Sequence, residues 1–237
     1  MATQHTFTFM GTGAGCGVPA FFCDCPACNE ARQDPRARRG DCGVMVRGER
    51  TLLIDTPPDL RHQLLREDVR TVDRLLYTHA HFDHLGGLGE LEYLVQLVSK
   101  AVLPTYGSAD ALDGVKTEFH YMTYCLDLHE LAPFETLEFD GASYTALPVT
   151  HAPGTYGYLI ETPATRLFYA SDTGKLPEAT AERVRGVDVM ALDAGTLYLT
   201  HLAMHYDEPV TLAELEDYLQ QYEGRVRPAA DGLTLDI

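Results

Sequence analysis

The densest group of potential metal ligands in the sequence is the run His79-Ala80-His81-Phe82-Asp83-His84. Three imidazoles and one carboxylate within six residues can reach the same small volume from a single loop. Neutral imidazole and carboxylate are the usual protein ligands of Zn²⁺, Mn²⁺ and Fe²⁺. One histidine in a protein is usually a packed or surface residue, but this density favours a metal site.

Three further candidate ligands each follow a segment with the pattern of a strand. They are His151, Asp172 and His201. A polar residue that closes a strand is ordinary turn chemistry, so each position alone is weak support. Their shared placement at strand ends makes them candidates for the same metal centre as the histidine run.

A second group of potential ligands lies near the N-terminus, where Cys23, Cys25 and Cys28 place three thiols within six residues. A tetrahedral structural zinc needs one more ligand. His205, four residues after His201, is the candidate donor. The other cysteines stand alone and are expected to be ordinary buried thiols: Cys16, Cys42 and Cys125.

Strands are expected to position these residues. Residues 6–10 alternate polar and apolar side chains before a glycine-rich turn, and residues 44–46 and 51–55 flank Gly48 as a hairpin that ends on Asp55. Residues 74–78 form a short apolar strand that leads directly into the histidine run. The remaining expected strands cover residues 102–106, 135–139, 143–149, 157–160 and 166–170.

Two helices are expected beside these strands. The first starts at Asp59, after Pro57-Pro58, and continues through Leu65. The second starts at Gly86-Gly87, and its apolar face is expected to consist of Leu88, Leu91, Leu94, Val95 and Leu97.

Length and composition predict one domain over residues 1–237, because 45% of the residues are hydrophobic and can form a sizeable core. The net charge of -17 disfavours a nucleic-acid partner, since phosphate binding depends on Lys and Arg clusters. No window approaches the roughly 18 apolar residues of a membrane span, and the N-terminus lacks signal-peptide regions. We therefore expect a cytoplasmic protein without a membrane partner.

Several of these features, taken in chain order, resemble the metallo-β-lactamase superfamily. They are Asp55, the His-x-His-x-Asp-His run, His151, the Ser171-Asp172-Thr173-Gly174 turn and His201. The resemblance covers nearly the whole chain. It implies an α/β fold, the four-layer αββα sandwich of that superfamily, with two divalent metals in the active site.

The resemblance also implies a role for each ligand. One metal would be held by His79, His81 and His151, and the second by Asp83, His84 and His201. Asp172 would bridge the two metals, and Asp55 would support the ligands from behind. Two metals roughly 3.5 to 4 Å apart can activate a shared water and polarise a phosphoryl oxygen. The implied nucleophile is a metal-bridging hydroxide, with Asp83 and Asp172 as catalytic residues.

Within the superfamily, four further segments resemble the PhnP-like cyclic phosphodiesterase branch: Gly11-Thr12-Gly13, Gly17-Val18-Pro19-Ala20, the three-cysteine cluster and the Thr200-His201-Leu202 end with His205. This resemblance implies hydrolysis of small cyclic or activated phosphodiesters, such as 5-phosphoribosyl 1,2-cyclic phosphate. It implies Mn²⁺ or Zn²⁺ at both active-site positions and one structural Zn²⁺ at Cys23, Cys25, Cys28 and His205.

One interval departs from that branch, in which a loop and a crossing helix separate the strands that end near Asp193 and His201. That interval contributes a histidine thought to be the general acid. Here only Ala194-Gly195 separates the apolar segments Val187–Asp193 and Thr196–His201. This interval is long enough for a tight hairpin but too short for a parallel crossover. Our hypothesis is that a segment between about Asp193 and Thr196 is missing from the sequence, and we assign no general acid.

Two other functions stay open. A tRNA 3′-processing endonuclease of the same superfamily would also cleave phosphodiesters, but the net charge of -17 argues against an RNA substrate. A non-hydrolytic cofactor-handling protein of the PqqB-like branch would share the cysteine cluster. The expected partner is a small-molecule phosphodiester, and a homodimer is left open. The segments expected to contact the substrate are Phe21-Phe22, Glu118–Tyr124 with His120, Tyr121 and Tyr124, and Ala152–Tyr156.

Overall fold

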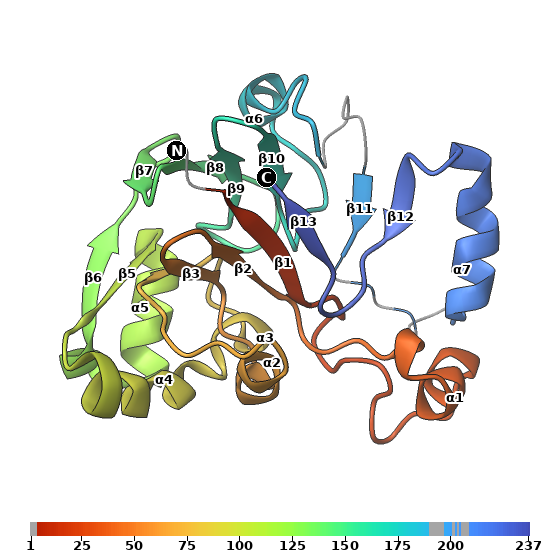
Figure 1. Cartoon of the computed structure of the whole chain (residues 1–237), viewed down its shortest axis with the longest axis horizontal. Helices are drawn as coiled ribbons and strands as arrows, with labels where there is room; N and C mark the ends of the chain where they lie inside the picture. Colours follow the sequence, from red (N-terminus) through yellow and green to blue (C-terminus); the bar gives the residue numbers. More distant parts are fainter. Residues whose placement is uncertain (1–3, 190–196, 201, 203, 205–208) are drawn as a thin grey trace.

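Two β-sheets pack face to face at the centre of the molecule, and helices cover their outer faces (Figure 1). The structure is a computed structural model, which describes residues 4–189, 197–200, 202, 204 and 209–237. Within these residues no helix is long and apolar enough to span a membrane.

The larger sheet joins the two ends of the chain to the strands that carry the histidine run. Among the described residues it has seven strands in the order β13-β1-β2-β3-β4-β5-β6. Strands β3 to β6 run parallel, whereas β13, β1, β2 and β3 pair antiparallel. The strands are β1 (Thr6–Gly11), β2 (Gly43–Arg47), β3 (Thr51–Ile54), β4 (Arg74–Leu76), β5 (Leu103–Gly107), β6 (Leu126–Glu130) and β13 (Thr234–Asp236).

The second sheet is an antiparallel meander in the order β10-β9-β8-β7. Its strands are β7 (Thr136–Phe139), β8 (Ala142–Pro148), β9 (Tyr156–Glu161) and β10 (Arg166–Tyr169). A separate parallel pair joins β11 (Leu197–Leu199) to β12 (Val226–Pro228). Helix α7 lies between these two strands in the chain, as a parallel connection requires.

The helices lie mainly on the outer side of the larger sheet and beside the cysteine cluster (Figure 1). The α-helices are α1 (Pro26–Gln33), α2 (Leu60–Arg66), α3 (Phe82–Leu85), α4 (Leu91–Tyr93), α5 (Ala109–Glu118), α6 (Glu178–Arg183) and α7 (Leu212–Leu219). Shorter or irregular helical turns are η1 (Pro35–Ala37), η2 (Leu88–Glu90), η3 (Leu94–Ser99), η4 (His120–Cys125) and η5 (Gln220–Tyr222).

Alternation along the strands divides the hydrophobic core into layers. On β3, Leu52 and Ile54 face the second sheet, whereas Leu53 faces the helices that pack on the outside. On β10, Leu167 belongs to the core between the sheets, and Phe168 faces the outer layer around α6. This alternation is the strand period of two, and it confirms the four-layer αββα sandwich.

The predicted hairpin around Gly48 and the strand that leads into the histidine run are confirmed as β2–β3 and β4. The apolar face predicted for the second helix is correct at Leu88, Leu91 and Val95, which are buried, and wrong at Leu97, which is 69% exposed. It is wrong there because residues 88–99 form an irregular succession of η2, α4 and η3. The hypothetical missing segment lies outside the described residues, and so do residues 190–193 of the predicted hairpin partner Val187–Asp193.

Candidate metal centre

The candidate ligands lie where strands end at one edge of the two sheets. His79 and His81 follow β4, and α3 carries Asp83 and His84. Because β3 and β4 are parallel, Asp55 at the end of β3 lies at the same edge. The histidine run therefore begins directly where the sheet ends.

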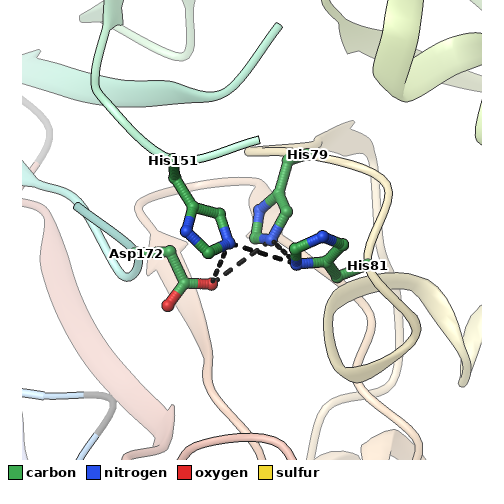
Figure 2. A group of neighbouring side chains, drawn as sticks. All are labelled: His79, His81, His151 and Asp172. Carbon is green, nitrogen blue, oxygen red and sulfur yellow. Dashed lines mark hydrogen bonds and ion pairs between the residues drawn. The ribbon is translucent and has the colours of Figure 1, made fainter. Parts of the chain in front are cut away.

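Two ligands come from the other sheet, where His151 follows β8 and Asp172 follows β10. Both β8 and β10 pair antiparallel with β9, so they run in the same direction and end at the same edge. This placement brings His151 and Asp172 to His79 and His81 across the junction of the sheets (Figure 2). The predicted convergence of these strand-end residues is present in the structure.

The first group consists of His79, His81, His151 and Asp172, whose ligand atoms all lie within 4.8 Å of one another. His79 Nε2 lies 2.9 Å from His81 Nδ1, and His151 Nε2 lies 3.1 Å from the same atom. Asp172 Oδ2 lies 3.3 Å from His79 Nε2 and 3.7 Å from His151 Nε2.

These spacings fit a metal ion. Around a tetrahedral metal with bonds of roughly 2.0 to 2.1 Å, neighbouring ligand atoms are about 3.3 Å apart. The four distances within the first group, from 2.9 to 3.7 Å, bracket that value. The imidazole and carboxylate donors are also the chemistry that zinc and manganese accept.

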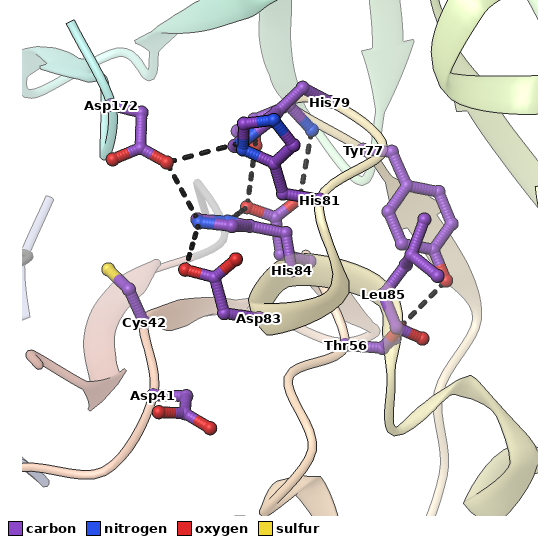
Figure 3. Close-up of polar contacts among 12 residues, drawn as sticks. Asp41, Cys42, Thr56, Tyr77, His79, His81, Asp83, His84, Leu85 and Asp172 are labelled. Atoms are coloured by element: carbon purple, nitrogen blue, oxygen red, sulfur yellow. Dashed lines mark hydrogen bonds and ion pairs between the residues drawn. The ribbon is translucent and has the colours of Figure 1, made fainter. Parts of the chain in front are cut away.

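The second group consists of Asp83, His84 and Asp172 (Figure 3). His84 Nε2 lies 2.9 Å from Asp172 Oδ2 and 3.5 Å from Asp83 Oδ2. The same Asp172 oxygen faces His79 of the first group at 3.3 Å. Asp172 is therefore common to both groups, which is the placement that the bridging role implied by the resemblance would need.

Asp55 and Thr78 orient two of the histidines through hydrogen bonds to their Nδ1 atoms. Asp55 is buried, and its Oδ2 accepts hydrogen bonds from Thr78 Oγ1 and His84 Nδ1, both at 2.8 Å. Since the single hydroxyl hydrogen of Thr78 points to Asp55, Thr78 Oγ1 accepts from His79 Nδ1 at 2.9 Å. In both histidines Nδ1 is thus a donor, so Nε2 is the ring atom that faces the cluster and would bind a metal in the neutral form.

Burial and charge act differently on the two buried histidines. Burial lowers the pKa of His79 to about 3, and the neighbouring His84 lowers it as well. Burial also opposes charge on His84, but Asp55 and Asp172 raise the pKa of His84 above its ordinary value. The carboxylates concentrated around His84 are the local negative charge that attracts a cation.

Three residues near the centre were not assigned a role from the sequence. One is Thr78, whose only signal is its position directly before His79. The second is Gly15, where a Cβ would lie 3.3 Å from Asp83 Oδ2, so the glycine-rich loop passes close to that ligand. The third is Cys42, a buried thiol that lies 3.4 Å from Tyr169 Oη and 3.4 Å from Thr200 Oγ1.

The cysteine cluster is assembled as predicted for three of its four members. The sulfurs of Cys23, Cys25 and Cys28 lie within 4.8 Å of one another. Proline at the start of α1 follows Cys25 directly, and Cys28 is buried in the first turns of that helix. The predicted ligands His201 and His205 lie outside the described residues.

The segments expected to contact substrate take several forms. Phe21 and Phe22 are exposed and form an edge-to-face pair with ring centroids 4.9 Å apart. Tyr121 and Tyr124 are exposed on η4. Glu118 and Phe119, at the end of α5, line a cavity beside the histidine run.

The fold and the site together define a β-lactamase superfamily domain. Residues 50–218 match the family described as "Beta-lactamase superfamily domain", which covers more than half of the chain. The chain therefore belongs to this superfamily, whose members are mainly hydrolases.

Three known proteins illustrate the similarity. A diphosphatase from the PhnP family has a crystal structure with a TM-score of 0.85 and 30% identity, covering 98% of both chains. A coenzyme PQQ synthesis protein B from Methylobacterium radiotolerans is 28% identical over 224 residues, which cover 80% of this chain and 72% of that protein. An octanoyltransferase from Porphyromonas gingivalis is 37% identical over 114 residues, which cover 48% of this chain but only 22% of that protein.

Proposed function

We propose that the protein is a dinuclear metal-dependent phosphodiesterase that hydrolyses small cyclic or activated phosphodiesters. The observation that carries the proposal is the position of Asp172, whose Oδ2 lies 3.3 Å from His79 Nε2 and 2.9 Å from His84 Nε2. A carboxylate shared by two ligand groups could bridge a pair of metals of the kind found in two-metal hydrolase sites. The similarity to a PhnP-family diphosphatase supports phosphate ester chemistry.

The chain's own residues would prepare the site in two ways. His79 and His84 turn Nε2 toward the cluster because Thr78 and Asp55 engage their Nδ1 atoms. His81 and His151 are exposed, so the phosphate would approach on their side of the cluster. Divalent metals held at these residues would lower the pKa of a water molecule and polarise a phosphoryl oxygen.

The ligand set proposed for each metal follows the two groups. The first metal would take His79, His81, His151 and Asp172, and the second would take Asp83, His84 and Asp172. His201 stays a sequence-based candidate for the second metal. We also propose that the two active-site metals are Mn²⁺ or Zn²⁺, that a structural Zn²⁺ binds at the cysteine cluster, and that the protein is cytoplasmic.

A second candidate is a non-hydrolytic, cofactor-handling role, which the similarity to a coenzyme PQQ synthesis protein B favours. Only the first candidate, the phosphodiesterase, would hydrolyse a phosphodiester substrate. A tRNA-processing role has less support, because a net charge of -17 disfavours long-range attraction of RNA.

The test is turnover of bis(p-nitrophenyl) phosphate by the full chain reconstituted with Mn²⁺. His81→Ala removes a ligand from the exposed side of the first group, and we expect kcat/KM to fall by more than the roughly 10- to 100-fold effect typical of outer-shell changes. His62→Ala is the matched control, since His62 is an exposed histidine on α2 outside the site. Equal rates for the wild type and His81→Ala would contradict the proposal, and a metal-loaded wild type without turnover would favour the second candidate.

A further inference from the structure

A small cavity lies directly beside the candidate metal centre. It has a volume of about 250 Å³ and is lined by Ala80, Phe82, Leu85, Glu118 and Phe119. Ala80 and Phe82 alternate in the chain with the candidate ligands His79, His81 and Asp83, so neighbouring residues of one segment line the cavity and form the metal centre. The opposite wall is the C-terminal end of α5.

The size of the cavity limits what it can hold. Sites for drug-sized ligands measure roughly 300 to 1,000 Å³. A cavity of about 250 Å³ suits a fragment of a few heavy atoms, such as the alcohol part of a small phosphodiester.

The lining has a distinct chemistry, with four apolar side chains and one carboxylate. Two of the apolar groups are the rings of Phe82 and Phe119, and Phe82 is 71% exposed. Within the described part of the chain, no hydrogen bond or ion pair engages the Glu118 carboxylate. The carboxylate at this wall is therefore available to a ligand.

Aromatic faces and a carboxylate together favour an organic cation. A quaternary or primary ammonium group over an aromatic ring is attracted by the negative face of the ring, and the attraction grows as water is excluded from the site. The Glu118 charge adds a direct attraction. An uncharged alcohol would gain neither, and an anionic one would be repelled by Glu118 and by the chain's net charge of -17.

From this lining we infer that the cavity binds the ammonium-bearing alcohol of a zwitterionic phosphodiester, with Phe82, Phe119 and Glu118 as its specificity-determining residues. The phosphate would lie at the metal centre, whose candidate ligands His79, His81 and Asp83 flank Ala80 and Phe82 in the chain. This inference rests on the proposed phosphodiesterase function and names the substrate class of that site.

The test compares two substrates that differ in charge but not in shape, p-nitrophenyl phosphorylcholine and p-nitrophenyl 3,3-dimethylbutyl phosphate. In the second, a carbon atom replaces the nitrogen of the quaternary ammonium group. For the wild-type protein with Mn²⁺, we expect kcat/KM to favour the choline ester by about 10-fold, mostly through KM. Glu118→Gln should reduce this ratio to about 2-fold or less, because the carboxylate attraction is removed.

Glu49→Gln is the matched control, since Glu49 is an exposed glutamate in the β2–β3 turn, at the opposite end of β3 from Asp55. It should keep the wild-type ratio. A wild type that hydrolyses both esters equally, or a Glu118→Gln variant that keeps the full preference, would overturn the inference while leaving the phosphodiesterase proposal standing.

If the wild type hydrolyses neither ester nor bis(p-nitrophenyl) phosphate, the proposed function fails and the cavity is tested by binding alone. Choline and 3,3-dimethylbutanol are then titrated into the wild type and Glu118→Gln and followed by NMR. Choline binding that exceeds alcohol binding and weakens several-fold in Glu118→Gln supports the cation site. Equal or undetectable binding of the two overturns it.

Discussion

Thr78 links two parts of the site that the sequence presents separately. Its backbone N–H donates to Asp55 Oδ1 and its hydroxyl donates to Asp55 Oδ2, both at 2.8 Å. The same hydroxyl accepts from His79 Nδ1. One threonine therefore fixes the carboxylate that orients His84 and also the ring of His79.

Thr78→Val tests this link, because valine keeps the shape and removes only the hydroxyl. The Asp55 carboxylate loses one donor in a fully buried setting, so we expect the metal-free protein to lose about 1 to 3 kcal/mol of unfolding free energy. Metal affinity should fall by about 10- to 100-fold, as for other outer-shell partners. Urea unfolding and calorimetric Mn²⁺ titration measure the two effects.

Thr78→Ser provides the control, since it restores the hydroxyl in a smaller side chain. It should recover most of the metal affinity. A valine variant with wild-type affinity would mean that Thr78 does not set the orientation of His79.

The individual ligands differed in how far the sequence could reveal them. The run from His79 to His84 was identifiable because its density has few structural explanations. His151 and Asp172 depended on the resemblance, since a lone polar residue after a strand is ordinary. Gly15 and Thr78 gave no such signal, because their roles arise from contacts across 68 residues between Gly15 and Asp83 and across 23 residues between Asp55 and Thr78.

At the scale of elements, α5 packs closely against the segment that carries the histidine run. Gly114 lies on α5 where an added Cβ would be 2.4 Å from the Cβ of Ala80, between His79 and His81. Glycine costs a helix about 1 kcal/mol relative to alanine, so its presence here is explained by the close approach of helix and loop.

Gly114→Ala is expected to lower both stability and phosphodiesterase activity. The helix gains about 1 kcal/mol of propensity, but overpacking costs about 1 to 3 kcal/mol and displaces either α5 or the His79–His81 segment. Thermal unfolding and turnover of bis(p-nitrophenyl) phosphate report the two effects. The double variant Gly114→Ala with Ala80→Gly should recover much of the loss, because the opposing methyl group is gone.

Gly89→Ala is the comparison for Gly114→Ala. Its added Cβ would meet Tyr121 Oη at 3.4 Å and Phe119 Cε1 at 3.9 Å, which are ordinary contacts, so little change is expected. Equal effects of the two substitutions would show that the approach of α5 to Ala80 is not a constraint.

The start of α2 carries a carboxyl group whose pKa is displaced upward. Burial, with the nearby Asp41 and Asp231, raises the pKa of Asp59 to about 7. The folded protein thus binds a proton that the unfolded chain releases near pH 4. Between about pH 4 and 7 the folded state holds more protons than the unfolded state, so this group's contribution makes stability fall as pH rises.

Asp59→Asn removes this titration and keeps the acceptor for Gln63 Nε2, which donates to Asp59 Oδ1 at 2.7 Å. We expect the variant to be more stable than the wild type at pH 8, by up to a few kcal/mol, and similar to it at pH 4. Urea unfolding across this range measures the difference. A difference that does not change with pH would contradict the assignment.

Elements marked by short apolar runs between turn residues were predicted best. The β2–β3 hairpin follows from two apolar runs on either side of Gly48, and β8, β9 and β10 were identified from similar segments. Helix α5 was not identified, although Ser108 caps it by accepting from Ala111 N. The cavity beside α3 could not be predicted, because it depends on where Glu118 and Phe119 pack in three dimensions.

At the scale of the whole molecule, the cysteine cluster belongs to a small core built from distant segments. Cys28 and Val18 come from the N-terminal part of the chain, and Met204 comes from near its other end. Leu212 and Leu215 of α7 pack against the same core. Leu202 N also donates to Thr12 O at 2.8 Å, so this region connects the glycine-rich loop to the late part of the chain.

A structural zinc at Cys23, Cys25 and Cys28 would therefore stabilise more than its own loop. Cys25→Ser should lower zinc content by one equivalent, and it should lower the Tm, because structural zinc contributes folding free energy directly. Phosphodiesterase activity should fall together with the zinc content, since Thr200 and Leu202 lie between this core and the metal centre near Cys42.

Cys125→Ser is the control, because Cys125 is buried in the other helical core and its change should lower the Tm while leaving the zinc content unchanged. Atomic emission measures the zinc content of each variant. A Cys25→Ser protein with wild-type zinc content would refute the structural zinc site.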